Sequence, residues 1–415
     1  MPADSSRREF LTGRSAVRAL AEVRDKLAPP LPPPESEQAS RSYLVSVSRD
    51  AMACTFEIAL NAGQYPGGTD AAVEALDLVD RLEDQLTIYR EQSELSRLNR
   101  RAASEAVVVE RGLFDLLTQA KRQCDETGGA VDITSGALMK TWGFYRRQGQ
   151  MPTQAEIDEA LSRVSSQHLV LDDAAQSVRF ARLGIELNLG AIGKGYALDR
   201  AAAHLESQGV GDFLIHGGAS SVLARGSRDA GRGSGFRVQG SEERGQRSEV
   251  RGQETGDREQ ETGGSGQQAN PQSEIRNPQS TAWLVALKHP LKPDERLAEF
   301  TLQNQALGTS GSGTQFFHYQ GKRYGHILDP RTGWPADKVL AATVIAPTAA
   351  LADALSTAFY VGGIELAEAY CQSHPEISAL LVIPAARSGA IDLVPVNLKP
   401  EQWRLVYDGP SGPSR

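Results

Sequence analysis

The sequence predicts an α+β fold, a layered domain in which mixed and antiparallel strands are covered by packed helices. Three observations predict this class. Segments whose apolar residues recur at helical spacing appear several times along the chain. Segments that alternate apolar and polar residues lie between them, and many follow one another as in β-hairpins. Helices and strands therefore alternate only in part, which favours a layered α+β domain over a doubly wound parallel sheet.

The composition of the 415 residues is that of a globular protein. Hydrophobic residues make up 40% and charged residues 23%, which allows a sizeable core. The net charge of −8 leaves no basic excess to neutralise phosphates, so no nucleic-acid partner is expected. No run approaches the roughly 18–20 apolar residues of a membrane helix, so no transmembrane segment is expected. Cys54, Cys124 and Cys371 lie far apart, which predicts neither a disulfide framework nor a zinc site.

Residues 1–42 are predicted to stand apart from the folded domain. The stretch SRREFLTG at 6–13 is similar to a twin-arginine export signal. The charged residues that follow predict an amphipathic helix where a signal peptide needs an apolar segment, and no cysteine follows soon that could carry a lipid. The stretch PPLPPPESEQ then predicts an extended linker. Export and a cytoplasmic location are both left open.

The folded domain is expected at 43–410, followed by a tail at 411–415. It opens with YLVSVSRDAMACTFEIAL, whose alternation predicts two paired strands. Apolar residues at helical spacing predict helices at 69–86, 112–129, 197–209 and 350–363. Short stretches rich in β-forming residues predict strands at 168–173, 177–182, 184–190, 212–218, 220–226, 283–290, 296–310, 341–347 and 379–385.

A low-complexity insertion is predicted at 227–280. The segment has almost no large apolar residue, so it cannot bury enough surface to offset its chain entropy, and we expect it to be disordered. It interrupts a predicted strand pair formed by 220–226 and 283–290. The entropy of closing a loop grows only logarithmically with its length, so the fold can carry the insertion.

Two motifs could bind a charged ligand. NLGAIGKGYALD, at 188–199, follows a predicted strand and opens a helix, with glycines that let a ligand approach and Lys194 at the helix start. This geometry suits a phosphate, although tight strand–helix packing is the alternative. LADALSTAF places Asp353 and Thr357 one helical turn apart, where their oxygens could share a hard cation such as Mg²⁺. The alternative is an acid near the helix start and a half-buried threonine.

Two further stretches carry polar groups beside apolar ones. GGAVDITSGALMKTWGF places Asp132 and Thr134 just after a helix end, where a capped turn is the alternative to a site. YGHILDPRTGWP, at 324–335, places an imidazole, a carboxylate, a guanidinium and a hydroxyl within seven residues and closes with Gly and Pro. A lone His326 would be structural, but its neighbours make a catalytic loop an equal interpretation.

In their order along the chain these motifs resemble the ApbE family of FAD:protein FMN transferases, formerly described as thiamine-biosynthesis lipoproteins. The resemblance covers about 43–407 apart from the insertion, and HILDPRTG is its most specific part. It also rests on Met52-Ala53-Cys54-Thr55, DQLTIYREQSELSRLN, VDITSGALMKTWGF, NLGAIGKGYALD, HGG, GTSG and LADALSTA. It implies a layered ApbE/T-fold-like domain, a periplasmic or membrane-associated location, and transfer of FMN from FAD to a Thr hydroxyl of a partner flavoprotein, with Mg²⁺ bound and AMP released.

The resemblance also implies roles for individual residues. His326 would accept the proton of the attacking hydroxyl, while Mg²⁺ and Lys194 would neutralise charge on the phosphoryl oxygens. Asp329 and Arg331 would pin the loop of His326. FAD would be bound by Met52, Tyr89, Ala130, Val131, Asp132, Asn188, Lys194 and Ile327. Mg²⁺ would be held by the Ala191 carbonyl, Asp353 and Thr357, with Ser356 close by.

Three positions depart from the pattern of the family. Ala53 stands where a glycine is usual, Asn188 where an aspartate is usual, and Ser356 where some members carry a second aspartate. Activity is still expected, because Lys194, His326, Asp353 and Thr357 are present. Two other functions remain alternatives to FMN transfer. One is an Mg²⁺-dependent FAD pyrophosphatase in which water replaces the threonine hydroxyl, and the other is a flavin-binding protein without turnover.

Overall fold

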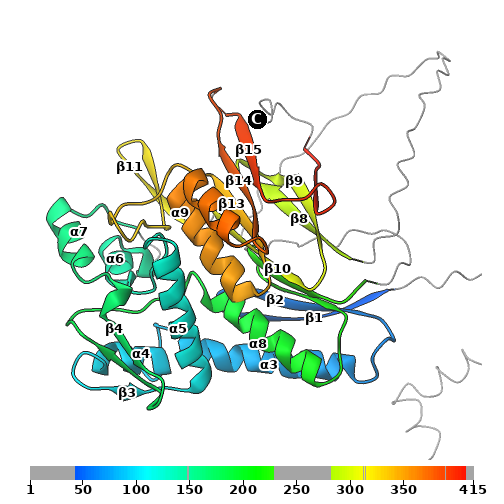
Figure 1. Cartoon of the computed structure of the whole chain (residues 1–415), viewed down its shortest axis with the longest axis horizontal. Coiled ribbons are helices and arrows are strands. Elements are labelled where there is room, and N and C mark those ends of the chain that lie inside the picture. Colours follow the sequence, from blue (N-terminus) through cyan, green and yellow to red (C-terminus); the bar gives the residue numbers. More distant parts are fainter. Residues whose placement is uncertain are drawn as a thin grey trace, which may run out of the picture. The chain divides into compact units, whose positions relative to one another are not determined.

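The computed structural model describes residues 43–146, 149–228, 282–311, 313, 315–387 and 389–407. The predicted N-terminal helix, the linker, the C-terminal tail and all but the first two residues of the predicted insertion lie outside the described residues. The α+β class is confirmed, with antiparallel sheets and packed helices (Figure 1). None of the helices in these ranges is long and apolar enough to cross a membrane.

An eight-stranded sheet forms the centre of the described fold, and each of its strand pairs is antiparallel. Its order is β1-β2-β6-β7-β10-β13-β14-β15. The strands are β1 (Leu44–Ala51), β2 (Cys54–Asn61), β6 (Phe213–Gly217), β7 (Ser221–Arg225), β10 (Gln305–Gly311), β13 (Ala341–Ala346), β14 (Ser378–Pro384) and β15 (Ile391–Val396).

The described residues also form three smaller antiparallel sheets. The sheet β16-β9-β8 packs on one face of the large sheet, where Trp283 and Phe300 share a core with Leu214 and Val222. The other two are β3-β5-β4 and the hairpin β11-β12, which leads directly into His326. Their strands are β3 (Val107–Val108), β4 (Leu169–Asp172), β5 (Ser177–Phe180), β8 (Trp283–His289), β9 (Lys292–Leu302), β11 (Phe316–Tyr319), β12 (Lys322–Gly325) and β16 (Trp403–Leu405).

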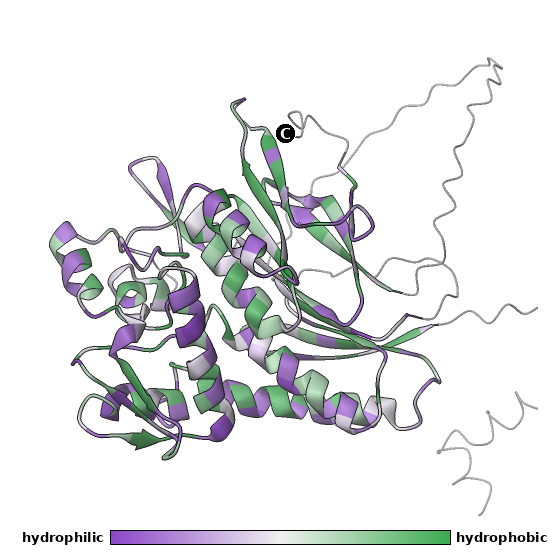
Figure 2. Cartoon of the chain, in the orientation of Figure 1, coloured by the Kyte–Doolittle hydropathy of each residue, from purple (hydrophilic) through white to green (hydrophobic). Residues whose placement is uncertain are grey.

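Helices cover the opposite face of the large sheet and form a layer beside it (Figure 1). Figure 2 shows hydrophilic and hydrophobic bands alternating along α3, as expected of a helix with one buried face. The helices are α3 (Gly68–Leu86), α4 (Glu94–Arg101), α5 (Arg111–Glu126), α6 (Gly136–Thr141), α7 (Gln154–Leu161), α8 (Gly193–Ser207) and α9 (Ala349–Ser373), with short 3₁₀ turns at Phe144–Arg146 and Ser166–His168.

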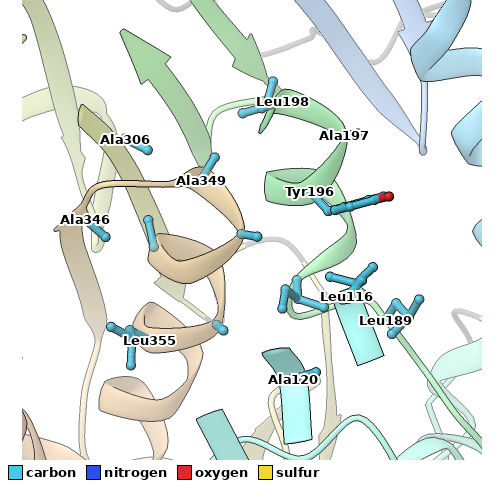
Figure 3. Packing of buried hydrophobic residues seen from close by; sticks show 14 of the residues in the cluster. Leu116, Ala120, Leu189, Tyr196, Ala197, Leu198, Ala306, Ala346, Ala349 and Leu355 are labelled. Carbon is cyan, nitrogen blue, oxygen red and sulfur yellow. The ribbon is translucent and has the colours of Figure 1, made fainter. Parts of the chain in front are cut away.

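Close packing of α8 against α9 positions the site described below. Ala197 of α8, Ala349 of α9 and Leu116 of α5 belong to one buried core (Figure 3). A Cβ at Gly195 would lie 2.2 Å from the Ala349 carbonyl oxygen. Only glycine therefore allows the first turns of the two helices to approach this closely. At Gly195 the glycine of this motif therefore serves close helix packing, the alternative to phosphate binding. The same packing places Lys194 beside α9.

Four local predictions are wrong. The stretch 296–310 is not one strand, because β9 ends at Leu302 and β10 begins at Gln305. The segment 184–190 is not a strand and forms only an isolated bridge, because Asn188 uses its amide on the Ile133 carbonyl and its side chain on the Gly190 amide. The strands β7 and β8 do not pair, since β7 lies between β6 and β10 while β8 pairs with β9. Val73 belongs to the apolar repeat that predicts the helix at 69–86, which places it on the buried face, but it is 38% exposed, and alanines such as Ala72 and Ala75 are buried instead.

Candidate active site

The candidate site forms where the first turns of α8 and α9 meet beside the ends of β7 and β10. Each helix supplies a carboxylate to N-terminal amides of the other. Asp353 accepts a hydrogen bond from the Gly195 amide at 2.8 Å. Asp199 accepts from the Ala349 and Ala350 amides at 2.8 and 2.9 Å. These exchanged contacts satisfy amides that a helix N-terminus leaves free, and they fix the two helices to each other.

Replacing Asp199 with Ala should lower the free energy of unfolding by about 2–4 kcal/mol, because two amides of α9 would lose their acceptor. Urea unfolding at neutral pH measures this loss. Asp172→Ala is the matched control, since Asp172 accepts a single amide, that of Ala175, in an exposed turn. The control should change stability by less than about 1 kcal/mol. Equal losses in both variants would contradict a special role for Asp199.

Asp353 is a buried carboxylate held by neutral donors. The Ser221 hydroxyl donates to its two oxygens at 2.8 and 3.0 Å. Burial raises the pKa of Asp353 to about 6, and the nearby charge of Lys194 acts in the opposite direction. In the ranges that the structure describes, no lysine or arginine forms an ion pair with it. A carboxylate enclosed in this way gains from a cation placed beside it.

Hydroxyl groups line the next turn of α9. Thr357 lies one turn after Asp353 and donates from Oγ1 to the Asp353 backbone carbonyl at 3.2 Å. The Ser310 hydroxyl from β10 lies 2.9 Å from that of Ser356 and 3.0 Å from that of Thr357. These oxygens, with the backbone carbonyl of Ala191 just before α8, are the hard donors that Mg²⁺ prefers.

Such a set needs only one carboxylate. Among the described residues, no cluster of three or more His, Cys, Asp or Glu side chains could hold a metal. The chemistry of the donors and the enclosed charge of Asp353 therefore fit a magnesium ion completed by oxygens of a ligand.

Lys194 links the charged groups of the site. It lies in the first turn of α8, and its Nζ donates to the hydroxyl of Ser220. Its charge lowers the pKa of Asp353, of His326 and of the Cys54 thiol, although burial is the largest influence on all three. Lys194, Asp353 and His326, which lie far apart in the sequence, therefore share one region of the structure.

His326 is half-buried and held in one orientation. Its Nδ1 lies 3.1 Å from the Gln315 carbonyl oxygen. A carbonyl can only accept, so Nδ1 carries the proton and Nε2 keeps its lone pair. The imidazole packs edge-on against the Phe144 ring, with 6.4 Å between centroids. Burial lowers the pKa of His326, the Gln315 hydrogen bond opposes this, and Lys194 lowers it further, so the neutral form is favoured.

The loop after His326 is pinned by its own side chains. The Arg331 guanidinium donates to both carboxylate oxygens of Asp329 at 2.8 Å, and the Arg331 amide donates to Asp329 Oδ1 at 2.9 Å. Gly333 adopts a left-handed conformation at φ 76°, and its carbonyl accepts from the Trp142 indole at 2.8 Å. Asp329 and Arg331 thus pin the loop, as the resemblance implies.

Residues predicted to bind FAD lie on several elements. The Tyr89 side chain is 70% exposed, and its ring stands edge-on to that of Tyr145, with 6.2 Å between centroids. The Asn188 side-chain amide lies 3.4 Å from the Tyr145 hydroxyl. Met52 lies in the turn between β1 and β2, and Ile327 is buried beside His326. Tyr89, Tyr145 and Asn188 thus form a continuous wall that includes two predicted residues.

Asp132 serves the fold in this structure. Its carboxylate accepts from the Thr134 amide and hydroxyl at 2.8 and 2.7 Å and from the Ser166 amide at 2.9 Å. The turn is therefore capped, and Ala130 and Val131 are buried beside it. Asp132 also lines a cavity of about 420 Å³, together with Gly128, Gly129, Ser165, Ser166, Pro330 and Arg331 among others. None of the other predicted site residues lines this cavity.

Sequence patterns did not predict the neutral partners of the site. Ser220 and Ser221 lie just after the glycine pair of HGG, and Ser310 lies in GTSG, but neither stretch predicts the contacts of its serines. Gln315 and Tyr145 lie in segments without any motif for their contacts. A serine near a strand end is common, and nothing local distinguishes these from others.

The first turns of two helices, a lysine beside them and a buried carboxylate define the site as one suited to a phosphorylated ligand. The chain belongs to the ApbE family, whose sequence model matches residues 52–270 and 261–381. Related proteins named FAD:protein FMN transferase occur in Klebsiella pneumoniae, 28% identical over 75% of this chain and 81% of the relative, and in Treponema pallidum, 29% identical over 79% and 82%.

Solved structures show the same fold. Flavin transferase ApbE from Vibrio cholerae superimposes with a TM-score of 0.65 at 22% identity, covering 86% of this chain and 97% of that chain. The ApbE protein from Thermotoga maritima superimposes with a TM-score of 0.64 at 24% identity, covering 82% and 94%. The predicted ApbE-like architecture is therefore confirmed.

Proposed function

We propose that this protein transfers FMN from FAD to a threonine hydroxyl of a partner flavoprotein and releases AMP. The observation that carries the proposal is that Lys194, in the first turn of α8, lies next to the Gly195 amide that Asp353 of α9 accepts from, and that its charge also acts on His326. The names of the relatives support flavin transfer between FAD and a protein. The threonine, the AMP and the use of Mg²⁺ belong to the proposal.

The pyrophosphate of FAD would lie at the first turn of α8. Backbone amides and the helix dipole favour an anion there, and Lys194 adds a full positive charge. The exposed ring of Tyr89 offers a face for an aromatic ring of FAD. Met52, Asn188, Ile327 and the turn at 130–132 would complete the walls.

Mg²⁺ would be held by Asp353, Thr357 and the Ala191 carbonyl. When bound, it would withdraw negative charge from the phosphoryl oxygens. Contacts within the chain already position the residues of this proposed metal site. The Ser221 hydroxyl and the Gly195 amide orient the Asp353 carboxylate, and α9 holds Thr357 one turn further on.

His326 would act as the general base. With Nδ1–H donating to the Gln315 carbonyl, Nε2 can accept the proton of the threonine hydroxyl. The threonine oxygen then forms a bond to the FMN phosphorus, the bond from that phosphorus to the bridging oxygen breaks, and AMP leaves. The pinned loop keeps the imidazole in place, which lowers the entropy lost on reaching the transition state.

Incubating the protein with FAD, Mg²⁺ and a candidate acceptor flavoprotein tests the proposal. The acceptor, weighed by mass spectrometry, should gain one FMN joined through a phosphoester, and AMP should appear in equal amount. An acceptor in which the target threonine is replaced by valine should gain nothing. Free FMN and AMP without a gain in acceptor mass would assign a pyrophosphatase. Bound flavin with neither product would assign a binding protein without turnover.

A further inference from the structure

The turn between β1 and β2 has an unusual backbone for its residues. The register pairs Ala51 with Cys54, so Met52 and Ala53 form a two-residue turn. Both are left-handed, with φ of 50° and 61°. Such turns match the twist of a hairpin but favour Asn and Gly, because a Cβ is crowded in this conformation. A contact from outside the turn would therefore help to hold it.

Glu83 on α3 makes that contact. Its carboxylate oxygen accepts a hydrogen bond from the Met52 amide at 2.9 Å. A hydrogen bond to a charged acceptor is stronger than one between neutral groups. Glu83 is 31 residues away in the sequence, so the bond ties the turn to the helix layer.

The turn lies beside the charged centre of the site. The Gly218 amide donates to the Thr55 carbonyl at 2.9 Å, and a Cβ at Gly218 would lie 3.1 Å from that of Cys54. Two residues beyond Gly218, Ser220 holds Lys194. The charges of Lys194, Asp353 and Glu83 all act on the Cys54 thiol. A movement of this turn would therefore shift residues at the proposed binding place of the flavin and the phosphates.

We propose that Glu83 is a positioning residue for the flavin substrate: it holds the Met52–Ala53 turn in its left-handed form and so fixes the Met52 wall of the site. This inference rests on the proposed function. Glu83 does not touch the reacting atoms, so its loss should weaken FAD binding and leave the transfer step nearly intact. A purely structural role would instead lower stability and scale down kcat through the loss of folded protein.

Glu83→Ala should raise KM for FAD about tenfold while kcat changes by less than about threefold. Without Glu83, the left-handed form of the turn would be only partly populated, and the apparent affinity for FAD falls in proportion. Glu83→Gln keeps an acceptor oxygen and should restore most of the affinity. Glu74→Ala is the matched control: Glu74 lies on the same helix and contacts His204 instead. It should behave as the unaltered protein.

Alkylation of Cys54 gives a readout that does not need activity. Cys124 and Cys371 are buried, at 6% and 4% exposure, while Cys54 is partly exposed, so a maleimide should label Cys54 first. Labelling should be faster in Glu83→Ala than in Glu74→Ala, because the turn opens and a negative charge near the thiol is lost. Peptide mapping confirms the site of labelling.

A second change supports or overturns the proposal. Glycine adopts the left-handed conformation freely, so Ala53→Gly in the Glu83→Ala background should recover part of the lost FAD affinity. Unchanged KM and unchanged labelling in Glu83→Ala would overturn the proposal. If the unaltered protein transfers no FMN and binds no FAD, the proposed function fails, while Cys54 labelling still reports whether Glu83 holds the turn.

Discussion

His326→Ala should slow FMN transfer by about 10²–10⁴-fold, the usual contribution of a well-placed general base. FAD affinity should change far less, since the imidazole is proposed to act on the acceptor hydroxyl. His326→Asn separates the two roles of the side chain: its amide can still donate to the Gln315 carbonyl, but it cannot take a proton. The His326→Asn variant should be nearly as slow as His326→Ala. Single-turnover transfer to an acceptor protein measures the step directly.

The pH dependence gives an independent check on His326. Burial lowers its pKa, the Gln315 hydrogen bond raises it, and Lys194 lowers it again, with a lowered value as the result. The base must be neutral, so activity should fall as pH drops through a value below the roughly 6.5 of an ordinary histidine. This acid limb should disappear in His326→Asn. A fully active His326→Asn protein would give the loop a positioning role and would assign proton removal to another group.

The architecture was predictable where a buried face makes apolar residues recur at helical or strand spacing in the sequence. α3, α5 and α8 lie at the predicted places, and α9 begins where predicted, because each buries one face against the sheet or its neighbours; α9 continues to Ser373, past the predicted end at 363. The short α6 and α7 and the exposed hairpin β11-β12 were not predicted, since few of their residues face the main core. The segment at 184–190 failed in the opposite way: it alternates like a strand, but side-chain and backbone contacts of Asn188 replace strand pairing.

The charged residues of the site were predictable, and their neutral partners were not. The residues alone made Lys194, His326 and Asp353 candidates beside structural alternatives, and the resemblance to the ApbE family implied their roles. Ser221 meets Asp353 across 132 residues of sequence, and Glu83 meets Met52 across 31. Such contacts depend on how helices and strands pack, which a local pattern does not record. Ser221 and Glu83 therefore had to come from the structure.

Asp353→Ala should lower Mg²⁺-stimulated FMN release by about 10²–10³-fold or more, because a bound metal supplies several kcal/mol of charge stabilisation in phosphoryl transfer. FAD binding should fall much less, since Lys194 and the helix amides remain. FMN release measured against Mg²⁺ concentration, with FAD binding followed by fluorescence, tests both statements. Normal turnover with Mg²⁺ in this variant would show that the metal site has been misplaced.

Asp353→Asn distinguishes loss of the metal from loss of the fold. Burial raises the pKa of Asp353 to about 6. The stability that the neutral carboxyl contributes is therefore fully present below the unfolded pKa of roughly 3.9. That contribution is lost as pH rises through about 6. At neutral pH the ionised carboxylate therefore destabilises the fold, and Asp353→Asn should keep or raise Tm while activity is lost. Mg²⁺ should raise the Tm of the unaltered protein and leave that of the variant unchanged. A fall in Tm that parallels the loss of activity would instead make Asp353 a structural link between α8 and α9.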